Sequence, residues 1–183
     1  VLAALGAYVL LVERDAPVVG EGDATPAPTA LPALLAFSSA DARVVRLERP
    51  ADGALTELHY RESGLWHITL PVEAIADQAE VTRLVGELAG VRPQRALTTT
   101  TSLPADYGLD PAAARITVEL ADATRHVLLL GAENVGGTAQ YAQVEGADTV
   151  YLVPLATGSD AARFLDEPPV APTPTPEATP TAA

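Results

Sequence analysis

The chain has 183 residues and contains no cysteine, no methionine and no lysine. Without cysteine, disulfide bonds, cysteine-ligated zinc, iron–sulfur clusters and thiol nucleophiles are excluded for these residues, as is a lipid-modified cysteine anchor. All eleven basic residues are arginine, which together with abundant alanine is typical of a GC-rich genome. Any chemistry of this chain therefore comes from oxygen and nitrogen groups.

Positive charge is also scarce relative to negative charge. The formal net charge is −13 and the sequence pI is about 4.4. A chain this acidic repels phosphate backbones, so no binding to nucleic acid or to an anionic membrane surface is expected. About 130 residues remain when the low-complexity ends are set aside, which is enough for one domain with its own hydrophobic core.

The first twelve residues form an uncharged, apolar segment that ends at a cluster of charges. Twelve residues of helix span about 18 Å, against about 30 Å for the hydrocarbon core of a bilayer. We interpret residues 1–12 as the C-terminal part of an N-terminal membrane segment, because the apolar run continues past the small residues that resemble a cleavage site. A cleaved signal peptide and a buried core helix are the alternatives.

Low-complexity sequence flanks the central part of the chain. Residues 13–36 form a linker rich in Pro, Gly, Thr and Ala, which buries little apolar surface and is expected to stay extended. Residues 168–183 form a tail with repeated Thr-Pro, a composition that favours polyproline II or disorder. The folded domain is therefore predicted at residues 37–167.

Alternation of apolar and polar residues predicts that most of this domain is β-sheet. Ala51-Asp52-Gly53 supplies the turn of the first hairpin, and residues 61–64 form the next turn. Beyond that turn, Trp66, Ile68 and Leu70 share one face, with Trp66 in the core. The predicted strands cover residues 43–49, 55–60, 65–70, 115–120, 125–130, 139–144 and 149–153.

The clearest helix signal covers residues 77–89. Asp77 is a favourable N-cap, and Glu80 three residues later completes a capping box. Gly90 is expected to end the helix in a left-handed conformation. The apolar stripe has the i, i+3, i+4, i+7 spacing of a helix and comprises Val81, Leu84, Val85 and Leu88.

A short helix around residues 159–165 is expected to close the domain. The predicted fold class is therefore α+β, an antiparallel-rich sheet with one well-capped helix and a short C-terminal helix. Residues 44–60 and 116–130 are both strand–turn–strand units followed by more strand and a helix. This similarity suggests two degenerate repeats.

The three histidines are His59, His67 and His126. In a hairpin with a two- or four-residue turn, His59 and His67 fall out of phase and face opposite sides of the sheet. Only an odd-length turn or a bulge would bring them together. Because a metal site needs side chains that converge on one point, we expect no metal site and no cofactor.

Signatures of enzyme chemistry are missing from the sequence. It contains neither a G-x-S-x-G elbow nor an H-E-x-x-H helix, and no spacing singles out a pair of carboxylates. The glycine-rich residues 131–137 lack the Lys-Ser/Thr of a P-loop and open no predicted helix. We expect this segment to be a strand connection with positive φ. Tyr141 and Tyr151 are expected to cap the edge of the core.

Several segments resemble a known family. They include Tyr107-Gly-Leu-Asp-Pro111, Leu128-Leu-Leu-Gly131-Ala-Glu-Asn134, Tyr141-Ala-Gln-Val144, Thr149-Val-Tyr-Leu-Val153 and, upstream, Trp66-His-Ile-Thr-Leu-Pro71. They are similar to the family called domain of unknown function 4340, over roughly residues 40–166. The resemblance implies a bacterial envelope protein with one N-terminal membrane segment, and some relatives are associated with ABC-type export or gliding-related systems. It assigns no catalytic residues.

We therefore expect a membrane-anchored domain outside the cytoplasm that acts as a non-enzymatic binding or accessory module, with an envelope protein or a transporter as partner. No catalytic, metal-binding or cofactor-binding residue is assigned. A carboxylate-dependent hydrolase and a small-molecule sensor are the alternatives. A pocket holding two carboxylates with raised pKa values would favour the hydrolase, and a deep apolar pocket around Trp66 or Tyr141 would support the sensor.

Overall fold

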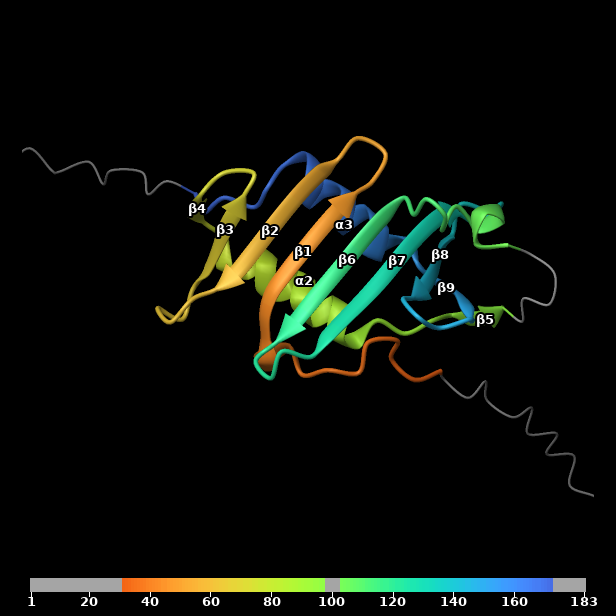
Figure 1. The fold of residues 1–183 in the computed structure, drawn as a ribbon, viewed down its shortest axis with the longest axis horizontal. Coiled ribbons are helices and arrows are strands. Elements are labelled where there is room, and N and C mark those ends of the chain that lie inside the picture. The colour runs from red at the N-terminus through yellow and green to blue at the C-terminus, as the bar shows by residue number, and fades with distance from the viewer. Residues whose placement is uncertain (1–30, 98–102, 173–183) are drawn as a thin grey trace, which may run out of the picture.

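The structure, a computed structural model, describes residues 31–97 and 103–172. In them the chain forms a nine-stranded antiparallel sheet with two α-helices on one of its faces (Figure 1), which confirms the predicted α+β class. In chain order the elements are the 3-10 turn η1 (Ser39–Asp41), β1 (Ala42–Arg49), β2 (Ala54–Tyr60), β3 (Trp66–Leu70), β4 (Ala74–Ile75), α2 (Gln78–Gly90), β5 (Arg95–Leu97), the 3-10 turn η2 (Pro104–Tyr107), β6 (Ala114–Leu120), β7 (Arg125–Glu133), β8 (Ala139–Val144), β9 (Val150–Pro154) and α3 (Leu155–Asp166).

The sheet has an internally repeated topology, with strand order β4-β3-β2-β1-β6-β7-β8-β9-β5. Each half consists of four consecutive strands followed by a helix, and the first strands of the two halves, β1 and β6, pair at the centre. After α2, the chain adds β5 to the far edge of the second half. After α3, Val170 bridges Ala76 beside β4, at the far edge of the first half. The topology therefore repeats, as the sequence suggests.

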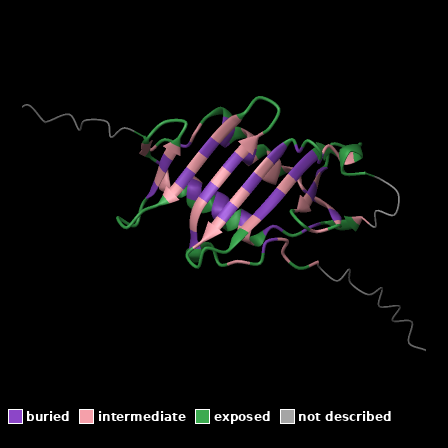
Figure 2. Cartoon of the chain, in the orientation of Figure 1, coloured by how far each residue is buried: buried purple, intermediate pink, exposed green. Residues whose placement is uncertain are grey.

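The core lies between the helices and one face of the sheet. Along the central strands, buried residues alternate with partly exposed ones, which Figure 2 shows as stripes across the sheet. Val45 of β1 and Ile116 of β6 are fully buried, and Phe164 of α3 is fully buried against this layer. Each such side chain contributes about 1.5–3 kcal/mol when it leaves water. The alternation predicted from the sequence therefore determines which face of the sheet is covered.

The start of α2 is held by Asp77, as predicted. The Asp77 carboxylate accepts hydrogen bonds from the backbone N–H groups of Ala79 (2.9 Å) and Glu80 (3.1 Å). The second half of the capping box is not made: the Asp77 N–H donates to the Pro169 carbonyl, and the Glu80 side chain binds Arg163. A backbone contact from a distant segment therefore replaces the local one.

The end of α2 differs from the prediction. Gly90 is the last helical residue, and its φ is not positive. The next residue, Val91, leaves the helix with φ −60° and ψ 115°. Val91 is buried and its carbonyl accepts a hydrogen bond from the Leu34 N–H, so packing of the exit segment sets the path of the chain. The prediction of a left-handed Gly90 is therefore wrong.

Three further details differ from the predicted elements. The last helix covers Leu155–Asp166 and is longer than the predicted helix at residues 159–165. The strands β4 and β5 were not predicted, because they have only two and three residues, too few to give a periodic signal. Leu70 is 40% exposed although Ile68 is buried, because the pairing of β2 with β3 shifts register beside Glu57.

The packed structure extends beyond residues 37–167 on both sides. Leu35 is fully buried, and the Ala171 N–H donates to the Ile75 carbonyl. The predicted membrane segment, residues 1–12, lies outside the described residues, as do most of the predicted linker and tail. In the described part of the chain, neither helix has the length and apolar character needed to cross a bilayer.

Candidate functional site

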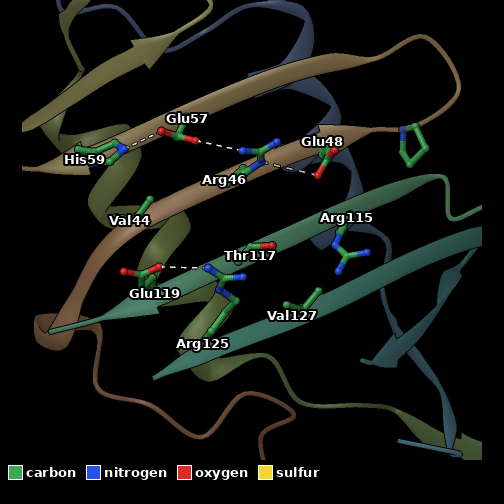
Figure 3. A pocket seen from close by; sticks show the side chains of 11 residues that line it. Val44, Arg46, Glu48, Glu57, His59, Arg115, Thr117, Glu119, Arg125 and Val127 are labelled. Atoms are coloured by element: carbon green, nitrogen blue, oxygen red, sulfur yellow. Dashed lines mark hydrogen bonds and ion pairs between the residues drawn. The ribbon is translucent and has the colours of Figure 1, made fainter. Parts of the chain in front are cut away.

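The face of the sheet that the helices leave open carries the polar side chains of the central strands. Because side chains alternate along a strand, the residues between the buried ones of β1 and β6 point away from the helices. These include Arg46 of β1 and Thr117 of β6, which are direct cross-strand partners. A hollow of about 570 Å³ lies over this region (Figure 3). We refer to it as the central hollow.

Three arginines from three neighbouring strands line the central hollow: Arg46 of β1, Arg115 of β6 and Arg125 of β7. In Figure 3, Thr117 lies between Arg46 and Arg125, and the guanidinium of Arg115 lies to one side of them. Three glutamates, Glu48, Glu57 and Glu119, line the same hollow. The charge of the hollow is therefore balanced, although the whole chain is strongly acidic.

Each of these arginines has a carboxylate partner. Arg46 lies 3.4 Å from Glu57, and Arg125 lies 3.6 Å from Glu119, both longer than the 2.7–2.9 Å typical of a charge-assisted hydrogen bond. Arg115 pairs with Glu145. Because these groups are partly exposed to solvent, the pairs add little to stability. Their guanidinium N–H groups are therefore accessible to a partner molecule.

Glu57 is the most connected acidic group of this face. One of its carboxylate oxygens lies 2.7 Å from Nε2 of His59, and the Thr69 hydroxyl donates to it at 3.3 Å. The hydrogen bond with His59 is the main cause that lowers the pKa of Glu57, against the opposing effect of its partial burial. Glu57 therefore presents a fixed negative charge that orients the His59 ring.

The two histidines of the first half face the same side of the sheet, so the prediction that they are out of phase is wrong. His59 of β2 and His67 of β3 are direct cross-strand partners. The connection between Tyr60 and Trp66 comprises residues 61–65, five rather than the four predicted, because β3 begins at Trp66. An odd-length turn restores the phase.

The third histidine belongs to the covered face. His126 is the cross-strand partner of the buried Val118, and its ring stacks on Phe37 with 5.6 Å between ring centroids. Across residues 31–97 and 103–172, no group of three or more His, Cys, Asp or Glu side chains converges to hold a metal ion.

The segment Tyr107 to Pro111, which carries the family resemblance, packs over the outer part of the open face. The Tyr107 ring contacts the Tyr141 ring of β8 with 4.8 Å between centroids, and Leu109 is buried. Gly108 has φ +66°, and its backbone approaches β7 closely at Ala132. The motif therefore has a packing role in this domain.

The glycine-rich segment is a strand connection. Gly137 has φ +61°, which confirms the prediction of positive φ, whereas Gly131 lies within β7. Asn134 closes the turn: its side-chain oxygen accepts hydrogen bonds from the N–H groups of Thr138 (2.9 Å) and Ala139 (3.2 Å).

A second set of charges joins α2 to α3. Arg83 lies 3.1 Å from Asp160 and also contacts Glu87 and Glu80. Arg83 lowers the pKa of Asp160, whereas burial and the neighbouring Asp160 raise the pKa of Glu87. Two raised carboxyl pKa values in one pocket would favour the hydrolase alternative, whereas in this pair one pKa is raised and the other is lowered. We interpret the cluster as an ion network between the helices.

The pocket near Trp66 is small and not purely apolar. Trp66 and Tyr60 border a hollow of about 280 Å³ that also includes Arg43. The guanidinium of Arg43 lies 5.3 Å from the centre of the Tyr60 ring. These features differ from the deep apolar pocket that would support the sensor alternative.

The sequence did not single out the arginines of the central hollow. Alternation shows that Arg46 shares a face with Glu48 on its own strand, and likewise that Arg115 shares a face with Thr117. Which strands are neighbours is set by the pairing of β1 with β6, and these are about 70 residues apart in sequence. No local signal indicates that pairing.

The fold and the site define a two-layer α+β domain with one helix-covered face and one open, charge-balanced face. The model of the family described as Domain of unknown function (DUF4340) matches residues 66–167, from the start of β3 to just beyond α3. The chain belongs to this family. No curated protein and no solved structure matches the chain.

Proposed function

We propose that this protein is a non-enzymatic binding module of the bacterial cell envelope. In this proposal residues 1–12 hold it in the membrane, the domain lies outside the cytoplasm, and a protein partner docks on the open face of the sheet. The observation that carries the proposal is the open face itself: both α-helices of the described residues lie on the other face (Figure 1), and charged side chains of the central strands surround the central hollow (Figure 3).

The open face has a suitable size for a protein interface. Strands of seven to nine residues are about 25 Å long, and four strands spaced about 4.8 Å apart add nearly 20 Å of width. This gives a footprint of roughly 500 Å² before side chains are counted, comparable with the approximately 800 Å² that each partner buries in a standard interface.

The charges of the central hollow favour a partner with both acidic and basic groups. Three arginines and three glutamates line the hollow, so a polyanion and a polycation would each meet like charge there. Half-exposed ion pairs such as Arg125–Glu119 contribute little free energy, so their side chains can exchange partners at little cost. Complementary charge patterns of this kind contribute specificity and association rate more than affinity.

A transport role rests on the family resemblance. Some relatives are associated with ABC-type export, and an accessory domain tethered beside a permease would meet it at high local concentration. We therefore propose that the partner is an envelope component of an ABC-type transport system.

Site-specific photo-crosslinking in membranes of the native host tests the docking surface. A photoreactive amino acid replaces Thr117 on the open face or, as the control, the exposed Arg92 on the helix side. We expect a discrete adduct from position 117 and none from 92, with the adduct identified by mass spectrometry as a transport component. Equal adducts from both positions, or none from 117, would contradict docking on the open face.

Charge variants separate recognition from folding. Arg125→Glu reverses one charge, and the swapped variant R125E/E119R keeps the internal pair while it reverses the pattern on the face. If the partner recognises this pattern, both variants lose the adduct. Arg92→Glu changes the net charge as much as Arg125→Glu does and should keep the adduct. Restoration of the adduct by the swap would show that only the internal pair matters.

A further inference from the structure

His59 and His67 form a pair that the structure brings together on the open face. They are directly opposite each other on β2 and β3, and both border a hollow of about 700 Å³ beside the central hollow. Trp66 and Ile68, the strand neighbours of His67, are buried toward the helices, so His67 points to the open side. The two imidazoles therefore occupy one surface.

The geometry of such a pair suits a metal ion. Directly opposed residues of an antiparallel pair have Cβ atoms about 4.5–5.5 Å apart. Two imidazole nitrogens that bind one metal ion at about 2.0–2.1 Å lie about 3 Å apart. Rotation about the side-chain bonds of two opposed histidines covers this difference without movement of the backbone.

Glu57 supplies the outer support that metal-binding histidines use. A histidine that binds a metal ion almost always donates a hydrogen bond from its other ring N–H to a carboxylate, a carbonyl or water. This hydrogen bond fixes the orientation of the ring and raises its basicity. Glu57 holds Nε2 of His59 at 2.7 Å, so Nδ1 of the same ring is left for a ligand. Glu62 and Arg61, in the connection between the strands, border the same hollow, and the Arg61 guanidinium pairs with Glu73.

We propose that His59 and His67 form a binding site for a divalent transition-metal ion, with their two imidazole nitrogens as the protein ligands, water in the remaining positions and Glu57 as the positioning group for His59. The described residues hold no third converging ligand, so the ion remains open to a ligand from outside the domain. The Irving–Williams order and the preference of Cu²⁺ and Ni²⁺ for nitrogen and oxygen ligands rank these two ions above Co²⁺ and Mn²⁺ at this site.

The site goes beyond the proposed docking function and does not depend on it. A hairpin with His59 and His67 out of phase would hold the two imidazoles on opposite faces of the sheet, but the observed pairing places them on one face. The net charge of −13 also favours the approach of a cation over that of an anion.

Copper titration of the untagged full chain in detergent tests the site. Calorimetry measures the stoichiometry, and pulsed electron paramagnetic resonance of the Cu²⁺ complex counts the bound imidazoles. We expect one Cu²⁺ that carries two imidazoles, and the same site to bind Ni²⁺. His67→Gln should leave one imidazole and weaken binding by more than about tenfold, since even loss of an outer partner has an effect of this size. Glu57→Gln should weaken binding about tenfold and keep both imidazoles.

The third histidine provides a matched control. His126 stacks on Phe37 on the covered face, so His126→Gln should bind copper as the unmodified chain does. The double variant H59Q/H67Q measures any background from the chain terminus, and circular dichroism checks that each variant folds. Equal binding by the unmodified chain and the double variant, or a spectrum with fewer than two imidazoles in the unmodified chain, would overturn the proposal.

Discussion

A Cβ atom placed on Gly131 of β7 would lie 2.2 Å from the carbonyl oxygen of Tyr107. The motif segment at residues 107–111 therefore lies directly on the backbone of β7, and glycine is required there for space, because Gly131 has no positive φ. The contact ties η2 to the open face, beside the rings of Tyr107 and Tyr141.

Gly131→Ala should destabilise the domain by about 3 kcal/mol, because the new methyl group meets backbone that cannot rotate away. Gly86→Ala is the matched control: it lies inside α2, has open space around its Cβ position, and should stabilise by about 0.5–1 kcal/mol through helix propensity. Denaturant unfolding measures both. Similar midpoints for the two variants would mean that the segment at residues 107–111 is not held against β7.

Asp77→Ala should lower the free energy of unfolding by about 1 kcal/mol through loss of the N-cap of α2. Asp77→Ser should recover most of this loss, because a hydroxyl also accepts hydrogen bonds from the first N–H groups of a helix. Urea unfolding of both variants provides the comparison. An unchanged midpoint for Asp77→Ala would mean that the helix does not depend on this cap.

Asp160→Asn should destabilise the domain at pH 7, and this destabilisation should become smaller as the pH falls below about 3.9. Arg83 lowers the folded-state pKa of Asp160, so its stabilising effect is present above the unfolded pKa of about 3.9 and is lost as the pH falls through the lower folded value. Glu87 has a raised pKa and the opposite sign: its contribution is present at low pH and is lost as the pH rises. Unfolding curves of Asp160→Asn and the unmodified chain between pH 7 and pH 3 test the prediction, and a difference that does not change with pH would contradict it.

Residues 1–12 should hold the full-length protein in the membrane. After cell fractionation we expect the protein in the membrane pellet, resistant to salt and carbonate washes and released by detergent. A variant with two arginines in place of Leu2 and Leu5 should move to the soluble fraction. These positions are nearest the middle of a membrane helix of about 20 residues that ends at residue 12, and each charge at the centre of such a helix costs about 2.5–3.5 kcal/mol. Recovery of the uncleaved, unmodified protein in the soluble fraction without detergent would contradict the anchor.

Local signals predicted most of the elements correctly. The central strands and the cap of α2 depend on alternation and on hydrogen bonds within a few residues, so they can be recognised without knowledge of the rest of the chain. Local sequence did not predict the exit of α2 after Gly90, which the buried Val91 and its contact with Leu34 set. It also missed β4 and β5, which are too short to show a period.

The sequence by itself determined the α+β class, the charge and the alternation of buried and exposed side chains along the central strands. Only the tertiary structure decided which faces and strands meet. A connection of five rather than four residues brings His59 opposite His67. A shift of one residue in register moves every side chain of a strand to the other face of the sheet. The pairing of β1 with β6 brings Arg46 and Arg125 to one hollow, because long-range strand pairing depends on the packing of the whole core and leaves no trace in local sequence.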